Sequence, residues 1–484
     1  MSCLLKSSSI AHVVAPTMLG TVLCLAAGGC RTHEPRPLDV PGLAEAFLDR
    51  APVSFSMDLA VGPPGDAADG PTLDLDRAID IALVFNAELR TRRAEAGVAK
   101  AVSENAGLWP DPEIGLEFTR IIESIANPNE LFGTISFTIP LSGRLEIEKE
   151  RLGLAHSAEL AEIAALEWEV VHELKRRWLT WSAIEAEIGS ATMFLDQASS
   201  LFEVVATMES LGELPRIEAR LFRLAEIRGR ETIVALEMRR ERARFELFEI
   251  MGLPPEVAPV PAPAIDTSLV PDVSDDAPSY RRHPAVVAAV AHYDVAEKLL
   301  EEEVRRQWPD LVVGPGYGEQ DGYRQFTLGL SLPVPIFNGN RQAIEAAVAE
   351  REAAEVRVAA EIERAIARLA EARERSRGAA RHLELVRFDL LPLVETQYAE
   401  ARDLARLGEV NTLILLDSLL QRQQVAIRLI ESRREVALAA IDLSAALGPD
   451  DVPDVESEAS EETTDPPRTE RGIDIAAPEH GGRS

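Results

Sequence analysis

The stretch from Gly143 to Leu211 decides the fold, and it reads GRLEIEKERLGLAHSAELAEIAALEWEVVHELKRRWLTWSAIEAEIGSATMFLDQASSLFEVVATMESL. It has no proline and is rich in Ala, Leu, Glu, Arg and Ile, which favour helix. At 1.5 Å per residue, a helix of this length measures about 100 Å, which is too long for one globular core to bury. Apart from a break at Arg177, its apolar residues recur every three or four positions, as in a coiled-coil seam: Val170, Leu174, Trp181, Ile184, Ile188, Ala191, Leu195, Ala198, Phe202 and Val205.

The same stretch occurs a second time, from Gly339 to Leu407, with the same length. Other short motifs recur at a similar distance, so the chain contains an internal repeat of nearly 200 residues. We predict a first repeat at 73–252, a linker at 253–279 and a second repeat at 280–448. The matching pairs are Leu211-Gly212-Glu213 with Leu407-Gly408-Glu409, Trp109-Pro110-Asp111 with Trp308-Pro309-Asp310, and Met251-Gly252 with Leu447-Gly448.

Composition and charge limit which partners and which structural features the chain can have. The formal net charge is −31, so we expect no nucleic-acid partner. Residues 449–484 carry 11 acidic and 3 basic residues with few large apolar ones, which predicts a disordered acidic tail. All three cysteines lie within residues 1–30, so the rest of the chain has no disulfide framework and no cysteine-based metal site.

The N-terminus is typical of an export signal. One basic residue, Lys6, precedes an apolar run that ends in Ala26-Ala27-Gly28-Gly29 before Cys30. This pattern resembles a bacterial lipoprotein signal, in which residues 1–29 are removed and Cys30 is lipidated. An ordinary cleaved signal with an incidental cysteine is the alternative. Residues 30–72 are rich in Pro, Gly, Asp and Ala, which predicts an extended leader.

Each repeat is predicted to contain a shorter helix, two strands, the long helix and a returning helix. In the first repeat the shorter helix is expected at about Leu75–Leu108 and the returning one at about Arg216–Met251. These two together match the long helix in length, so we expect them to lie end to end beside it. Pro392 lies within the second long helix, where a proline predicts a bend or a break.

The predicted strands alternate strictly between apolar and polar residues. In the first repeat the apolar positions are Ile114, Leu116 and Phe118, then Ile135, Phe137 and Ile139, and the second repeat shows the same alternation over Phe326–Leu332. In an exported protein this pattern suits a membrane barrel or a half-buried soluble sheet. Four strands cannot close a barrel, and lipid does not tolerate an open sheet edge, so a barrel would require several copies of the chain.

With both repeats in view, the chain resembles the TolC family of outer-membrane efflux proteins from about Leu73 to Gly448. The resemblance rests on the order and spacing of short motifs: Asn86-Ala87-Glu88-Leu89, His283-Pro284-Ala285-Val286, the two Trp-Pro-Asp triplets, Leu332-Pro333-Val334-Pro335-Ile336-Phe337-Asn338, and Leu407-Gly408-Glu409 followed by Leu415-Leu416-Asp417. It implies a mainly α fold in which three chains share a 12-stranded barrel and an α-helical periplasmic tunnel. The Leu332–Asn338 motif and the short strand loops look more like the heavy-metal efflux branch of this family than its drug-exporting branches.

The resemblance also implies roles for single residues. Leu211, Gly212, Glu213, Leu407, Gly408 and Glu409 match the hairpin tips that meet a periplasmic adaptor protein, and Asp417 matches an acidic residue at the constricted tunnel entrance. A glycine that simply ends a helix is the alternative at the tips. Ile414 stands where some members have a second acidic residue. The implied partners are two further copies of the chain, the adaptor, an inner-membrane pump of the resistance-nodulation-division (RND) type and outer-membrane lipid.

Catalytic chemistry finds no support in the sequence. There is no phosphate loop, nucleophile elbow or paired-carboxylate signature, so we expect no enzyme, no catalytic residue and no cofactor. The histidines lack metal-ligand spacing, and Glu301-Glu302-Glu303 is expected to be a solvated face. We therefore expect a passive outer-membrane exit duct for substrates, among which metal cations are considered. The alternative is a periplasmic lipoprotein coiled-coil scaffold without a pore.

Overall fold

The computed structural model describes residues 33–50, 73–122, 129–254, 279–320, 322–406 and 412–449, together with residues 261, 263 and 265. They fall into two units, within residues 1–50 and residues 51–484. The first unit contains helix α2, Val40–Leu48, whose first turn is capped by the Asp39 carboxylate. The predicted lipid-attachment residue, Cys30, and most of the predicted leader lie outside the described residues.

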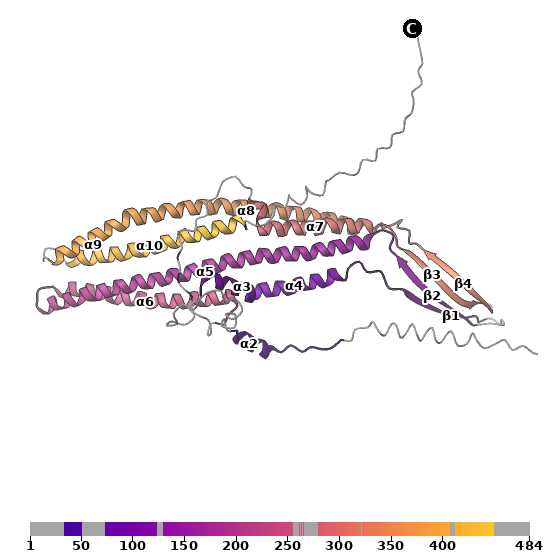
Figure 1. Cartoon of the computed structure of the whole chain (residues 1–484), viewed down its shortest axis with the longest axis horizontal. Coiled ribbons are helices and arrows are strands. Elements are labelled where there is room, and N and C mark those ends of the chain that lie inside the picture. Colours follow the sequence, from indigo (N-terminus) through magenta and orange to yellow (C-terminus); the bar gives the residue numbers. More distant parts are fainter. Residues whose placement is uncertain are drawn as a thin grey trace, which may run out of the picture. The chain divides into compact units, whose positions relative to one another are not determined.

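The second unit contains the two repeats (Figure 1). The first comprises α3 (Leu75–Phe85), α4 (Ala87–Glu104), β1 (Glu113–Arg120), β2 (Asn129–Ile139), α5 (Arg144–Ser210) and α6 (Arg216–Met251). The second comprises a 3₁₀ turn (Ser279–Arg282), α7 (Pro284–Arg305), β3 (Leu311–Gln320), β4 (Tyr323–Ser331), α8 (Arg341–Glu384), a π-helical turn (Leu385–Leu390), α9 (Leu391–Arg406) and α10 (Thr412–Leu447). The predicted class, mainly α with a small β part and a duplicated order of elements, is confirmed.

The helices of the second unit lie side by side as the repeat predicts. α5 contacts α4 and α6 of its own repeat and α7 and α10 of the other, and α8 packs on α7 and α10. The largest buried cluster joins α3, α4, α5 and α6 and includes Leu174, Trp178 and Leu247. No helix within the described residues is long and apolar enough to cross a membrane.

The shorter helices meet end to end beside the long ones, but the expected single helix at Leu75–Leu108 is wrong. It is divided at Asn86, which ends α3 and whose side-chain oxygen accepts hydrogen bonds from the N–H groups of Glu88 and Leu89 at the start of α4. The Asn86 amide also donates to the Ile250 carbonyl oxygen at 2.8 Å, which ties this junction to the end of α6. An Asn side chain competes with the helical backbone for hydrogen bonds, which explains the division.

The helix does not break at Pro392. The π-helical turn Leu385–Leu390 precedes it, and the N–H of Leu391 donates to the carbonyl of Val386, five residues back. A wider turn of this kind accommodates a residue that cannot sit in a regular α-helical ladder. Figure 1 shows α8 and α9 following one continuous path, whereas α5 is regular throughout.

The four strands form one antiparallel sheet in chain order, β1-β2-β3-β4. In the register, Ile114 pairs with Ile135, Phe137 with Val313, and Val313 with Leu330. Directly paired residues project to the same face of a sheet, so the apolar positions of all four strands share one face. Residues 123–128, between β1 and β2, lie outside the described residues.

Candidate functional site

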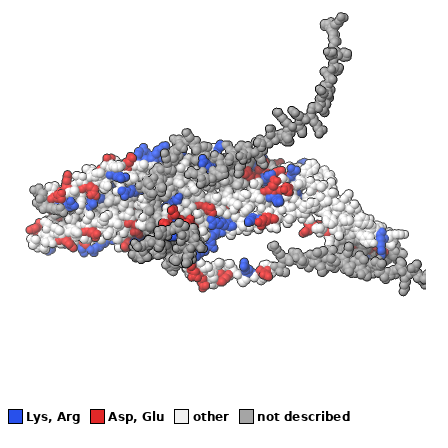
Figure 2. Space-filling view, in the orientation of Figure 1, with Lys and Arg blue, Asp and Glu red and all other residues white. Residues whose placement is uncertain are grey.

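The apolar face of the sheet is the first candidate site. Its side chains are mostly exposed in the single chain: Ile114, Leu116, Phe118, Leu131, Ile135, Phe137, Ile139, Leu311, Val313, Pro315, Tyr317, Phe326, Leu328 and Leu330. Charged residues of the described strands reach this face only at the end farthest from the helices, as Arg120, Glu319 and Arg324. In the view of Figure 2, charged side chains are scattered over the helices while the visible part of the sheet is mostly white.

The opposite face of the sheet carries mostly polar residues and glycines. It carries Thr134, Ser136 and Thr138 of β2 and Thr327 and Ser331 of β4. On β3 this face is occupied largely by glycine, and the Phe132 ring lies where a Cβ atom at Gly316 or Gly318 would stand. One face of the sheet therefore suits an apolar medium and the other suits water.

A cavity of about 1060 Å³ lies on the helical part of the second unit, against α4, α5, α7, α8 and α10. Its wall is mixed in charge and includes six arginines and six acidic residues: Arg92, Arg176, Arg357, Arg364, Arg368 and Arg375, with Glu88, Glu162, Glu169, Glu361, Glu371 and Asp442. This charge balance contrasts with the strongly acidic chain as a whole. The wall can therefore contact ions of either sign.

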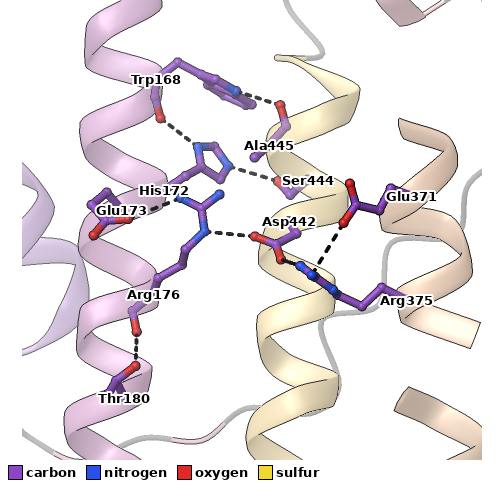
Figure 3. Close-up of polar contacts among 10 residues, drawn as sticks. All are labelled: Trp168, His172, Glu173, Arg176, Thr180, Glu371, Arg375, Asp442, Ser444 and Ala445. Carbon is purple, nitrogen blue, oxygen red and sulfur yellow. Dashed lines mark hydrogen bonds and ion pairs between the residues drawn. The ribbon is translucent and has the colours of Figure 1, made fainter. Parts of the chain in front are cut away.

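An ion-pair chain crosses one side of this cavity (Figure 3). Asp442 of α10 accepts hydrogen bonds from Arg176 of α5 and Arg375 of α8, each at 2.8 Å. Glu173 and Glu371 complete the chain, each 3.5 Å from the nearer guanidinium. One carboxylate therefore joins three helices from both repeats.

His172 lies beside these ion pairs, and its side chain is buried, with 2% of the residue exposed. Its Nδ1 is 2.8 Å from the Trp168 carbonyl oxygen and its Nε2 is 3.4 Å from the Ser444 hydroxyl, as Figure 3 shows. Burial lowers the pKa of His172 from its ordinary value of 6.5 to about 4. The ring is therefore neutral at physiological pH and acts as a packing and hydrogen-bonding group between α5 and α10.

Other histidines are also tied into the helices. His283 caps the start of α7 by accepting a hydrogen bond from the N–H of Ala285. Its pKa is lowered mainly by burial and, to a smaller extent, by the nearby positive charge of Arg368. His292 Nε2 lies 2.7 Å from Glu162. Among the described residues, no group of three or more His, Cys, Asp or Glu side chains is arranged to hold a metal ion.

The expectation that Glu301-Glu302-Glu303 forms a solvated face is wrong for two of its residues. Glu302 is 1% exposed and lies between Arg151, at 2.6 Å, and Arg306, at 2.5 Å. Glu303 is also buried; it pairs with Arg306 and accepts from the Asn340 amide before α8. These charges hold α5, α7 and the start of α8 together close to the sheet. Sequence spacing could indicate only the local pairs with Arg306, because Arg151 and Asn340 come from other elements.

The predicted tip Leu211, Gly212 and Glu213 follows the last turn of α5. Gly212 has φ of +78°, and the N–H of Glu213 donates to the carbonyl of Met208 at 2.9 Å, so this segment ends the helix in a glycine cap. No described atom lies within 4 Å of a Cβ atom built at Gly212, and Leu211 is exposed. Among the described residues, nothing therefore covers the outer side of Gly212. Its counterparts Leu407, Gly408 and Glu409 lie outside the described residues.

Asp417 lies on the exposed side of α10, one turn from the exposed Ile414. Its carboxylate accepts a hydrogen bond from Gln421 at 2.7 Å. A residue that sequence reasoning missed, Arg422, lies on the next turn and joins α10 to two other helices. Its guanidinium is 2.9 Å from Glu395 of α9 and 3.0 Å from Gln197 of α5.

Comparison with known proteins bears on this architecture. Residues 280–449 match the family described as outer membrane efflux protein. The matched residues coincide with the second repeat. The TolC-like resemblance predicted from the sequence is thereby confirmed. No curated protein matches the chain significantly.

Solved structures extend the similarity over both repeats. CusC, studied for transmembrane channel formation, superposes with a TM-score of 0.67 at 16% identity, covering 81% of this chain and 99% of CusC. The outer membrane protein VceC of Vibrio cholerae gives 0.65 at 14%, covering 77% and 96%. The CmeC outer membrane channel of Campylobacter jejuni gives 0.64 at 12%, covering 84% and 98%. This chain shares their fold, and CusC and CmeC are described as channels.

Proposed function

We propose that this chain is an outer membrane efflux protein and serves as the outer-membrane exit duct of a tripartite efflux system. In this proposal, three chains each give four strands to a 12-stranded barrel, and their helices continue as a tunnel into the periplasm. An inner-membrane pump of the RND type supplies the energy and a periplasmic adaptor connects it to the duct. The duct itself performs no covalent chemistry.

The observation that carries this proposal is the distribution of side chains on the sheet. Apolar residues of all four strands share one face and polar or glycine residues occupy most of the other. A barrel wall with lipid outside and water inside needs this division. A soluble coiled-coil scaffold would gain nothing from exposed Leu328, Leu330 and Phe326.

The sheet also supports the assembly of several copies. β1 and β4 are its two outer strands, and each pairs on one side only among the described residues. An unpaired strand edge in lipid leaves backbone N–H and C=O groups without partners, at a cost of several kcal/mol per group. Pairing β4 of one copy with β1 of the next would satisfy both edges.

The remaining parts of the duct follow from the sequence. Cys30 would carry the lipid anchor. The tips at Leu211-Gly212-Glu213 and Leu407-Gly408-Glu409 would contact the adaptor, for which the free outer side of Gly212 leaves room. Asp417, exposed on α10, would line the periplasmic entrance as a gate. The mixed-charge cavity wall would face the transported solute.

The test is to purify the full chain in detergent and measure its mass and its conductance in planar bilayers. The duct predicts a trimer that conducts ions. A matched variant with Leu328→Asp and Leu330→Asp, which places two charges on the lipid-facing side, should fail to insert while the helices keep their circular-dichroism signal. A monomeric chain without conductance would favour the scaffold.

We propose to test metal cations first as the cargo, because the Leu332–Asn338 motif resembles that of the heavy-metal efflux branch of the family. A strain lacking the chain should become sensitive to heavy-metal salts if they are exported through it. Unchanged metal tolerance together with increased sensitivity to organic toxicants would assign the duct to another cargo.

A further inference from the structure

The connection between β4 and α8, residues 332–340, is longer and more apolar than its counterpart in the first repeat. There, residues 140–143 join β2 to α5, whereas nine residues join β4 to α8. Val334, Ile336 and Phe337 in this β4–α8 connection are 69%, 73% and 95% exposed. Because large apolar side chains rarely protrude together into water without a partner, this surface calls for one.

The β4–α8 connection continues the apolar face of the sheet. On β4, Phe326, Leu328 and Leu330 are exposed on that face, and Leu332 and Val334 follow at the same alternate positions. No charged residue occurs between Arg324 and Arg341. The uncharged apolar surface therefore extends beyond the end of the strand toward the helices.

Two prolines reduce the number of backbone N–H groups in the β4–α8 connection. Pro333 and Pro335 have no N–H group. The N–H of Ile336 donates to the Val334 carbonyl oxygen at 2.9 Å and closes a tight turn around Pro335. Each N–H that is absent or paired lowers the cost of placing this segment in lipid.

The neighbouring connections place aromatic residues at the same end of the sheet. The register joins Ile139, at the end of β2, to Leu311, at the start of β3, and Val312 to Ser331, at the end of β4. Trp109 and Trp308 precede β1 and β3 at this end, and both are exposed. Tryptophan is enriched where a bilayer meets water.

We propose that the β4–α8 connection is a lipid-binding surface that inserts into the periplasmic leaflet of the outer membrane. Ile336 and Phe337 would lie among the acyl chains near the headgroups, with Trp109 and Trp308 at the headgroup level. This inference rests on the proposed function, because it needs the sheet to span the membrane. The occupant it specifies is lipid, and not a second copy of the chain.

The experiment uses the full chain reconstituted into phosphatidylglycerol and phosphatidylcholine vesicles. Phe337→Cys is labelled with an environment-sensitive fluorophore, and quenching is measured with nitroxide lipids and with iodide in the buffer. The native cysteines all lie within residues 1–30, so the labelled parent chain gives the background signal. We expect a blue-shifted emission that nitroxide lipids labelled near the headgroup quench and iodide does not.

Two matched positions make the result decisive. Leu328→Cys lies on the apolar face of β4 and reports whether the sheet is in lipid, and Val356→Cys lies on the exposed side of α8 and should respond only to iodide. If residue 328 is quenched by lipid and residue 337 is quenched by iodide, the β4–α8 connection lies in water and the inference is overturned. If neither quencher reaches residue 337, a second copy covers it, which also overturns the inference.

The same set of variants separates the two proposals. A Leu328→Cys probe that no lipid quencher reaches shows that the sheet is not in the membrane, so the proposed function fails first. A second variant, Phe337→Asp, supplies an independent readout. It should weaken association with vesicles and shift the Trp fluorescence to the red, while Val356→Asp leaves both unchanged. Identical behaviour of these two variants would contradict lipid contact at residue 337.

Discussion

Gly252 lies against the carbonyl oxygen of Phe85 so closely that a Cβ atom at residue 252 would overlap it. Gly252 ends α6 with φ of +65°, and Phe85 ends α3. The same arrangement recurs in the second repeat, where a Cβ atom at Gly448 would stand 3.2 Å from the Arg282 carbonyl oxygen. Each repeat thus has a glycine at the place where its two shorter helices meet.

We predict that Gly252→Ala destabilises the protein more than Gly448→Ala does. Both substitutions place a side chain at positive φ, which costs about 1 kcal/mol, and only residue 252 adds a direct overlap with backbone. Thermal unfolding in detergent measures the difference. Gly378→Ala is the control, because it lies inside α8 with no described atom within 4 Å of the added Cβ, and it should raise stability slightly. Equal effects at 252 and 378 would contradict the close packing.

Glu302→Gln should destabilise the junction between the helices and the sheet. The substitution leaves Arg151 and Arg306 without the buried carboxylate that both contact, and losing one partner of such a pair costs about 3–5 kcal/mol. Glu301→Gln, at the more exposed neighbour, should cost less than about 1 kcal/mol. Denaturant unfolding of both variants is the measurement, and equal losses would count against a structural role for Glu302.

His172 predicts a pH dependence of stability. The folded-state pKa of about 4 lies below the ordinary value of 6.5, so the unfolded chain binds the proton more readily. The stability that neutral His172 contributes is therefore fully present above pH 6.5 and is lost as the pH drops toward 4. The expected decrease in the free energy of unfolding is on the order of 3 kcal/mol.

The test of this pH dependence is to compare the parent with His172→Gln in denaturant unfolding across that pH range. The glutamine variant should be less stable at neutral pH and should lose less stability on acidification. Lys175, Arg176 and Asp442, whose charges act on the ring, remain in both proteins. Parallel pH curves for the two proteins would exclude His172 as the titrating group.

Gly212→Val tests the proposed adaptor contact. A β-branched residue is strained at φ of +78° and changes the tip without touching the described core. We expect export to fall while trimer formation and membrane insertion are retained. Gly189→Val is the matched control inside α5, where no described atom lies within 4 Å of the added Cβ. Export that is unchanged in Gly212→Val would remove the tip from the adaptor site.

The sequence predicted the order of elements because repeats, prolines and alternating residues are local signals. The division at Asn86 was missed because the amide's second partner, Ile250, is 164 residues away. The burial of Glu302 was missed for the same reason, since its partner Arg151 comes from α5. The roles of all the predicted site residues remain predictions, and Cys30, Leu407, Gly408 and Glu409 also lie outside the described part of the chain.

The unequal connections between strand and helix bear on the symmetry of the proposed assembly. Three duplicated chains would place six similar units around one axis, as if a shorter ancestor had formed a hexamer. The nine-residue segment before α8 and the π-helical turn before Pro392 occur in only one unit of each pair. Sixfold equivalence would therefore be lost at these two levels, and any solute or lipid bound there would meet three equal positions instead of six.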